Sequence, residues 1–326
     1  MMIKTLFKGY IFLELTSVYM WVGFLLAAYS VIANDSVQTL GTWIASNSER
    51  FKWQHLWLPA SAVLLFTLWY GWIVNGGDIS YGRLTKIPFQ EIQWYHAVAP
   101  LVLVALTKLG VPVSTTFLVL SAFATGVVFE KMLIKSALGY VVSATAAYTI
   151  WLAVSRWLET KADIPHGQDR WWRIGQWATT GWLWFTWLSH DMANIAVFLP
   201  RQVSLEMMFV ISAIFVVGLS YMFWERGGKI QQIVLTKVNT KYVRSATLVD
   251  FVYALVLYIF KEVNSIPMST TWVFCGLLAG RELAIATALD KKNIKKVFPM
   301  LTKDFFRIMI GLAISTIIVL SITYYK

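Results

Sequence analysis

The 326-residue sequence has little charge, since only 14% of its residues are Asp, Glu, Lys or Arg, whereas a soluble domain has about a quarter. Hydrophobic residues make up 58%, and several apolar runs exceed the roughly 18–20 residues that cross a bilayer. The alternating pattern of a membrane β-barrel is missing. The sequence therefore predicts an all-α, polytopic membrane protein. We expect it to be a multi-pass protein of a cell membrane, of the bacterial inner-membrane type.

Cysteine is nearly absent, and no metal-binding motif is visible. Cys275 is the only cysteine, which excludes a disulfide within the chain and a cysteine-based metal cluster. The four histidines are scattered, and no HExxH motif occurs. No recognisable nucleophile–base set supports an enzyme that would use a pair of carboxylates as acid and base. We therefore expect no enzymatic activity, no catalytic residues, and no cofactor apart from a coupling ion.

The net charge is +11, from 28 Lys and Arg against 17 Asp and Glu. No compact basic domain stands apart from the apolar segments, so we expect no nucleic-acid partner. In a membrane protein an excess of Lys and Arg marks cytoplasmic loops. Segment 225–244 has five basic residues and one acidic residue, whereas segment 75–93 has two of each. We expect 225–244 and the basic cluster at 291–296 to be cytoplasmic, and 75–93 to face outward.

Apolar segments of two kinds alternate along the chain. The long ones lie near 10–32, 55–74, 133–155, 171–199, 205–224 and 304–325. Two further regions, 94–129 and 247–283, each contain two shorter apolar runs separated by a polar motif. The runs on either side of "VPVSTT", about 94–109 and 116–129, are short for a membrane crossing and predict a re-entrant hairpin, with two ordinary crossings as the alternative.

Two sequence motifs occur twice at nearly the same spacing. "VPVSTT" at 111–116 matches "IPMSTT" at 266–271, and their prolines are 155 residues apart (267 − 112). "ANDSVQ" at 33–38 matches "SHDMAN" at 189–194, and their aspartates are 156 apart (191 − 35). Paired motifs in one order predict an internal repeat, as in secondary transporters.

The repeat sets the expected domain organisation. We predict a first half at 1–158, a short connecting loop at 159–170 and a second half at 171–326. Each half has three long helices and a hairpin, and a hairpin contributes an even number of crossings under either interpretation. The number of crossings in each half is therefore odd, so the second half should be inverted relative to the first.

The hydroxyl-rich motifs have the chemistry of an anion site. Proline ends a helix, and the Ser or Thr that follows is a natural N-cap of the next helix. The first backbone N–H groups of that helix are free, and its dipole end is positive. A single copy would be interpreted as a helix cap, but two copies at the repeat spacing favour a binding site. The candidate anion contacts are Ser114, Thr115, Thr116, Ser269, Thr270 and Thr271.

The second motif pair places carboxylates at apolar segments. A carboxylate in hydrocarbon is costly, so Asp35 and Asp191 should line a cavity or bind a cation. Neighbouring amide oxygens, from Asn34, Gln38 and Asn194, suit a hard ion such as sodium. The alternative is that these residues cap ordinary helices at the membrane surface. We predict a coupling-ion and substrate region at these five residues, with sodium at Asn34, Asp35, Asp191 and Asn194.

These motif pairs resemble those of the inorganic phosphate transporter (PiT) family, which carries Gly-Ala-Asn-Asp-Val-Ala-Asn-type and Pro-Val-Ser-Thr-Thr-His motifs in each half. "GGKIQQIVLTKV" at 227–238 is also similar to the family's second-half loop, and the resemblance runs from about residue 10 to 325. The resemblance implies two inverted repeats with hairpin tips that bind phosphate. It implies that the hydroxyl residues at 114–116 and 269–271 contact phosphate, and that Asn34, Asp35, Asp191 and Asn194 lie in the phosphate and coupling-ion region. The chain departs from the family motifs at Gln38, His190, Phe117 and Trp272.

We therefore expect a symporter that moves inorganic phosphate, driven by sodium or protons. The alternatives are a sulfate permease of the same fold, because a sulfate-transporting branch is similar to the phosphate proteins, and a passive anion channel. The expected partners are the transported anion and the lipid bilayer. A homodimer, in which a second copy of the chain is the partner, is a further candidate.

Overall fold

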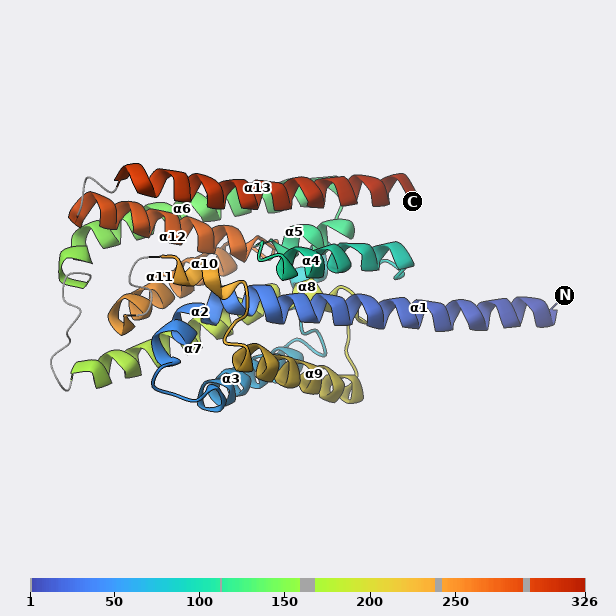
Figure 1. The fold of residues 1–326 in the computed structure, drawn as a ribbon. Helices are drawn as coiled ribbons and strands as arrows, with labels where there is room; N and C mark the ends of the chain where they lie inside the picture. Colours follow the sequence, from blue (N-terminus) through green and yellow to red (C-terminus); the bar gives the residue numbers. More distant parts are fainter. Residues whose placement is uncertain (1, 112, 159–167, 238–241, 290–293, 326) are drawn as a thin grey trace.

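The computed structural model describes residues 2–111, 113–158, 168–237, 242–289 and 294–325, and these ranges contain helices and no strand. Long helices lie side by side in Figure 1, and the outer ends of the first and last helices point to the same end of the molecule. Pro112, Lys291, Lys292 and most of the expected connecting loop lie outside the described residues.

Seven helical segments in the described ranges are long and apolar enough to cross a membrane. They are Thr16–Asn47, Trp53–Val74, Gly126–Arg156, Leu205–Trp224, Val243–Val263, Thr270–Leu289 and Ile294–Ile322. This confirms the prediction of an all-α, polytopic membrane protein.

The first half consists of long helices around a short hairpin. A π-helical turn joins the first two helices into one rod. The elements are α1 (Met2–Ser30), η1 (Val31–Asp35), α2 (Ser36–Asn47), α3 (Trp53–Val74), η2 (Arg83–Lys86), η3 (Trp94–Ala97), α4 (Val98–Lys108), α5 (Thr115–Leu118), η4 (Leu120–Ala122) and α6 (Gly126–Leu158).

The second half follows the same order with a longer hairpin. Its elements are α7 (Gln168–Asp191), α8 (Ala193–Ala196), α9 (Leu205–Trp224), α10 (Gln231–Leu235), α11 (Val243–Val263), α12 (Thr270–Leu289) and α13 (Ile294–Tyr325).

The two hairpins differ in length. In the first, α4 has 11 residues and α5 has four, too few to cross a bilayer. In the second, α11 has 21 residues and α12 has 20, which is long enough to cross a bilayer, although the sequence there shows two shorter apolar runs. After the tips, α12 continues without a break, whereas α5 ends at Leu118, a short 3₁₀ turn follows at Leu120–Ala122, and the chain restarts as a helix at Gly126.

The hairpins approach each other from opposite ends of the molecule. In Figure 1, α4 and α5 lie to the right of the centre, α11 and α12 lie to the left, and the two tips meet between them. This arrangement brings residues 113–116 and 268–271 together, although more than 150 residues separate them in the sequence.

The second hairpin is packed tightly against α6 through two small residues. A Cβ on Gly276 would lie 2.3 Å from the carbonyl oxygen of Tyr140, and a Cβ on Gly280 would lie 1.9 Å from that of Ala144. Glycines four residues apart allow two membrane helices to approach to backbone contact. The α6–α12 contact therefore fixes the position of the helix that carries the second tip.

A third repeat, which sequence analysis did not use, appears in the loops after α3 and α9. "GGDISYGRLTKI" starts at Gly76 and "GGKIQQIVLTKV" starts at Gly227, 151 residues later (227 − 76). Both glycine pairs have positive φ angles, +60° and +97° in the first loop and +83° and +55° in the second. Left-handed backbone of this kind favours glycine, which explains why both loops begin with the same pair.

Candidate functional site

The two hairpin tips begin with matching serine caps. The Ser114 hydroxyl accepts a 3.2 Å hydrogen bond from the backbone N–H of Phe117, and the Ser269 hydroxyl accepts one of 3.2 Å from that of Trp272. Both serines therefore cap a helix, as expected if each motif acts only as a helix cap. In these contacts each serine oxygen only accepts, so its own O–H group remains available as a donor.

The next residue of each tip binds the carboxylate of its own half. Thr115 donates to Asp35 over 2.5 Å, and Thr270 donates to Asp191 over 2.6 Å. The two bonds join matching atoms, Oγ1 to Oδ2, at matching positions of the repeat. Each hairpin tip is thus connected directly to the carboxylate that the sequence predicts for the cation.

The third residue of each tip crosses to the other tip. Thr116 donates to the carbonyl of Met268 over 3.2 Å, and Thr271 donates to the carbonyl of Val113 over 3.4 Å. Thr116 also lies 3.4 Å from Oδ1 of Asp191, which belongs to the other half. The tips therefore hold each other, and the two halves share one network.

Amide side chains complete the network. Asn34 donates to Asp35 over 2.6 Å and to the carbonyl of Val113 over 2.8 Å, and Gln38 donates to Asn34 over 3.1 Å. Asn194 donates to Asp191 over 3.1 Å, and its own Oδ1 atom is buried without a partner. An amide oxygen left open beside a carboxylate fits a hard cation.

All eleven residues expected at the site are buried in this region. Asp35 and Asp191 are each 2% exposed, so neither is a solvent-exposed helix cap. Asp35 occupies the last position of the π-helical turn between α1 and α2, a backbone irregularity that often marks functional sites.

The two carboxylates lack a direct cationic partner. No ion pair in the described part of the chain involves Asp35 or Asp191, and the two acidic groups act on each other electrostatically. Buried like charges without counterions are unfavourable in a low dielectric. This site can therefore bind cations or protons, and it provides neutral donors for an anion beside them.

Arg83 is a neighbour of the site that sequence analysis did not identify. It is 2% exposed, its Nε atom donates to the carbonyl of Ser189 over 3.1 Å, and its Nη2 atom lies 3.5 Å from Nε2 of His190. Burial lowers the pKa of Arg83 to about 10, and the nearby Asp191 carboxylate acts in the opposite direction, so the guanidinium stays charged at neutral pH. Comparison of the repeats missed it, because Val234 takes the matching position in the second loop and Arg83 has no charged counterpart there.

A third buried carboxylate was also missed. Asp250, 1% exposed, accepts a hydrogen bond from Thr42 and one of 2.5 Å from Thr180. It lies on α11 and faces α2 and α7. A lone aspartate within the apolar stretch that follows residue 247 was the signal for it.

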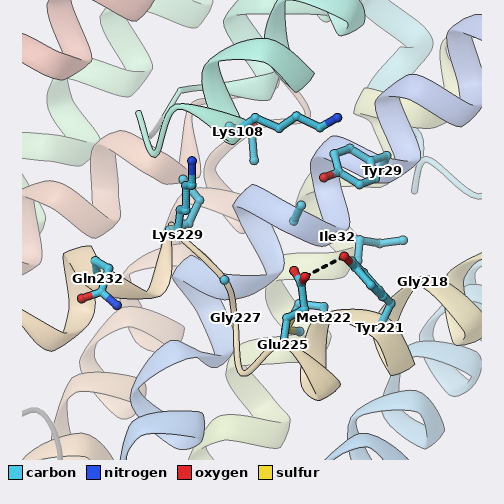
Figure 2. A pocket seen from close by; sticks show the side chains of 14 residues that line it. Tyr29, Ile32, Lys108, Gly218, Tyr221, Met222, Glu225, Gly227, Lys229 and Gln232 are labelled. Atoms are coloured by element: carbon cyan, nitrogen blue, oxygen red, sulfur yellow. Dashed lines mark hydrogen bonds between the residues drawn. The ribbon is translucent and has the colours of Figure 1, made fainter.

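A cavity of about 720 Å³ opens on the other side of the α1–α2 rod. Figure 2 shows Lys108 and Lys229 above it and the Tyr221–Glu225 pair below, joined over 2.6 Å. Ala33 lines the cavity, and the next residue in the chain is Asn34 of the network. Consecutive residues of the α1–α2 rod therefore belong to the cavity wall and to the buried network.

Comparison with known proteins supports the fold. No protein-family model matches the sequence, and no curated protein matches it. Among solved structures, this chain is similar to one described as the sodium-dependent phosphate transporter, with a TM-score of 0.62, 16% sequence identity, and coverage of 96% of this chain and 100% of that one. The chain therefore has the fold of that transporter.

Proposed function

We propose that this protein is a secondary active transporter that moves inorganic phosphate across the membrane together with sodium or protons. The observation that carries the proposal is the matched pair of hydrogen bonds, Thr115 to Asp35 and Thr270 to Asp191. Each bond joins an anion-binding motif to a cation-binding carboxylate within one half. The fold of the sodium-dependent phosphate transporter supports the same conclusion.

The anion is expected between the two hairpin tips. Free backbone N–H groups at the start of α5 and α12 would donate to it, together with the O–H groups of Ser114 and Ser269. A tetrahedral oxyanion with several acceptor oxygens matches donors that converge from two sides. Thr116 and Thr271 hold the tips together in this state, so they would change partners when the anion enters.

The coupling cation is expected at the carboxylates. The side-chain NH2 groups of Asn34 and Asn194 donate to Asp35 and Asp191, so each amide would turn its oxygen toward the cation when sodium binds, and oxygen ligands of this kind suit sodium. A proton on either carboxylate would neutralise the same charge and is the second candidate for the coupling ion.

The paired bonds suggest how the two ions depend on each other. A threonine hydroxyl can donate one hydrogen bond, and in this structure Thr115 and Thr270 donate it to the carboxylates. A cation on Asp35 or Asp191 would compete for the same oxygens and release the threonine to donate to the anion. Binding of the cation would then favour binding of the anion, which is a coupling free energy between two sites.

The cavity beside Asn34 is the expected route between the site and one side of the membrane. Lys108 and Lys229, both exposed, line it, and positive charge raises the local concentration of an anion. Access from the two sides would alternate as one group of helices moves against the other. A cell-membrane location of the bacterial inner-membrane type and a homodimer are part of this proposal.

Uptake of labelled phosphate into proteoliposomes tests the proposal. We expect saturable uptake that falls when choline replaces sodium, or when the proton gradient is abolished, and that excess sulfate inhibits weakly. Strong inhibition by sulfate together with labelled sulfate uptake would reassign the substrate to sulfate. Uptake that never saturates and ignores both cation gradients would indicate a passive channel instead.

A further inference from the structure

Arg83 is a buried cation that is anchored by the backbone and not by a carboxylate. Its Nε atom donates to the carbonyl of Ser189, and its Nη1 atom is buried without a partner. His190 offers no acceptor either: its Nε2 atom lies 2.8 Å from the carbonyl of Leu257, so that nitrogen must donate. The positive charge of Arg83 is therefore not cancelled by a direct ion pair.

The field of this charge falls on one half of the site. Arg83 acts on Asp191 electrostatically. The groups that act on Asp35 are Asp191, Thr115 and Asn34, none of which is a cation. The matching position in the second loop is Val234, which is apolar and packs against Gly41 of α2.

A second basic side chain lies on the same side. The Nζ atom of Lys135 donates to the carbonyls of Asn264 and Ile266 over 3.1 and 2.9 Å, just before the tip that starts at Met268. Lys135 also acts on Arg83 and on His190. Basic side chains therefore gather around the second tip, whereas Asp191, Thr115 and Asn34, which act on the first carboxylate, include no basic group.

We propose that Arg83 is a fixed cation that makes the two halves of the site unequal, weakening cation binding at Asp191 and strengthening anion binding beside it. Asp35 then holds the coupling cation tightly, and the cation at Asp191 is the easily released one. This inference rests on the proposed function, because it assigns different tasks to the two carboxylates of the same site.

The electrostatic role has a signature that a structural role lacks. Removing a positive charge should weaken binding of an anion and strengthen binding of a cation, whereas damage to the fold weakens both. Arg83 does not contact Asp191 directly. At such a separation, and in the effective dielectric of a protein, loss of its charge should change the affinity for the anion and the affinity for the cation each on the order of tenfold.

Equilibrium binding of ³²P-phosphate and ²²Na-sodium to purified full-length protein tests the inference. Arg83→Gln should bind phosphate about tenfold more weakly and bind sodium at its weaker class of sites about tenfold more tightly. Arg83→Lys, which keeps the charge, should stay close to the wild type. Arg201→Gln is the matched control, since Arg201 also donates to a backbone carbonyl, that of Ile87, and acts on Asp78 and not on the two site carboxylates.

A second comparison keeps the test independent of how well Arg83→Gln folds. In the wild-type background, Asp35→Asn should remove the tighter class of sodium sites and Asp191→Asn the weaker class. Equal sodium affinities at the two carboxylates would overturn the inference, as would an Arg83→Gln protein that binds both ions more weakly. A wild-type protein that binds neither ion would instead refute the proposed function.

Discussion

At the scale of single residues, the tip serines have two roles that can be separated. Ser114→Ala and Ser269→Ala each remove an N-cap and an O–H donor. Loss of the cap should cost about 1 kcal/mol of folding stability. Loss of a hydrogen bond to a charged ligand should cost roughly 1.5–3 kcal/mol of binding, which is roughly ten- to a hundredfold in phosphate affinity.

Ser204→Ala is the matched control, because Ser204 caps α9 in the same way, accepting from the N–H of Met207, far from the tips in the sequence. It should lose stability without losing phosphate affinity. Unchanged affinity in both tip variants, measured by binding of labelled phosphate, would mean that these serines are caps alone.

The two carboxylates can be tested in the same manner. Asp35→Asn and Asp191→Asn keep the shape of the side chain but remove its charge. Each should abolish accumulation driven by a cation gradient, even where some anion binding remains. Asp250→Asn is the control, because Asp250 is also buried and also accepts from two threonine hydroxyls, but it lies outside the network.

We expect the Asp250→Asn protein to keep cation-driven accumulation, measured with sodium and proton gradients imposed separately. Full accumulation by both the Asp35 and Asp191 variants would remove these carboxylates from the mechanism. Loss in all three variants would point to a general effect of altering a buried carboxylate.

What could be predicted from the sequence at this scale depended on repetition. The eleven site residues were found because each motif occurs twice, and the structure brings all of them into one buried region. Arg83 and Asp250 have no matching charged residue in the other half, so motif comparison passed over them. Their positions became clear only when the fold turned the loop after α3 inward and placed α11 against α2 and α7.

At the scale of helices, the contact between α6 and α12 is the most sensitive to substitution. Gly276→Ala and Gly280→Ala would place a Cβ within 2.3 and 1.9 Å of backbone carbonyl oxygens, so the helices must move apart. Overpacking of this kind should cost about 1–3 kcal/mol of stability, seen as a lower midpoint of thermal unfolding in detergent.

Gly181→Ala is the matched control for this contact. Gly181 also lies within a helix, α7, but a Cβ there would meet nothing within 4 Å. Alanine favours a helix over glycine by about 1 kcal/mol, so stability should stay level or rise. Equal losses at Gly181 and Gly280 would show that close packing of α12 on α6 does not limit stability.

Helix lengths were harder to predict than the motifs. The apolar runs around both hairpins look alike in the sequence, yet the second hairpin has helices of 21 and 20 residues and the first has helices of 11 and four. The end of α5 at Leu118, the 3₁₀ turn after it and the restart at Gly126 separate the two cases. Hydropathy averages over such breaks and cannot show them.

At the scale of the whole molecule, loop charge predicts the orientation in the membrane. Arg83, Lys237 and Arg244, which enter that comparison, are buried in the structure. The exposed charges that remain still differ, because Glu225, Arg226 and Lys229 after α9 sum to +1, whereas Lys86 and Glu91 after α3 sum to zero. Basic loops are expected on the cytoplasmic side.

Cysteine labelling tests this orientation. In a Cys275→Ala background, Arg226→Cys should react only from the cytoplasmic side and Lys86→Cys only from outside. Both positions are exposed, so a lack of reaction cannot be blamed on burial. Labelling of both by an impermeant reagent added to intact cells would contradict inverted halves.

The central claim is that the two halves of one chain bind an anion and a cation together and use the gradient of the cation to accumulate the anion. The most direct test is the internal concentration of labelled phosphate in proteoliposomes that start with equal phosphate on both sides and a sodium or proton gradient. We predict that phosphate rises above the external concentration and that collapse of the cation gradient releases it. Phosphate that only equilibrates under both gradients, in liposomes shown to contain folded protein, would contradict this account.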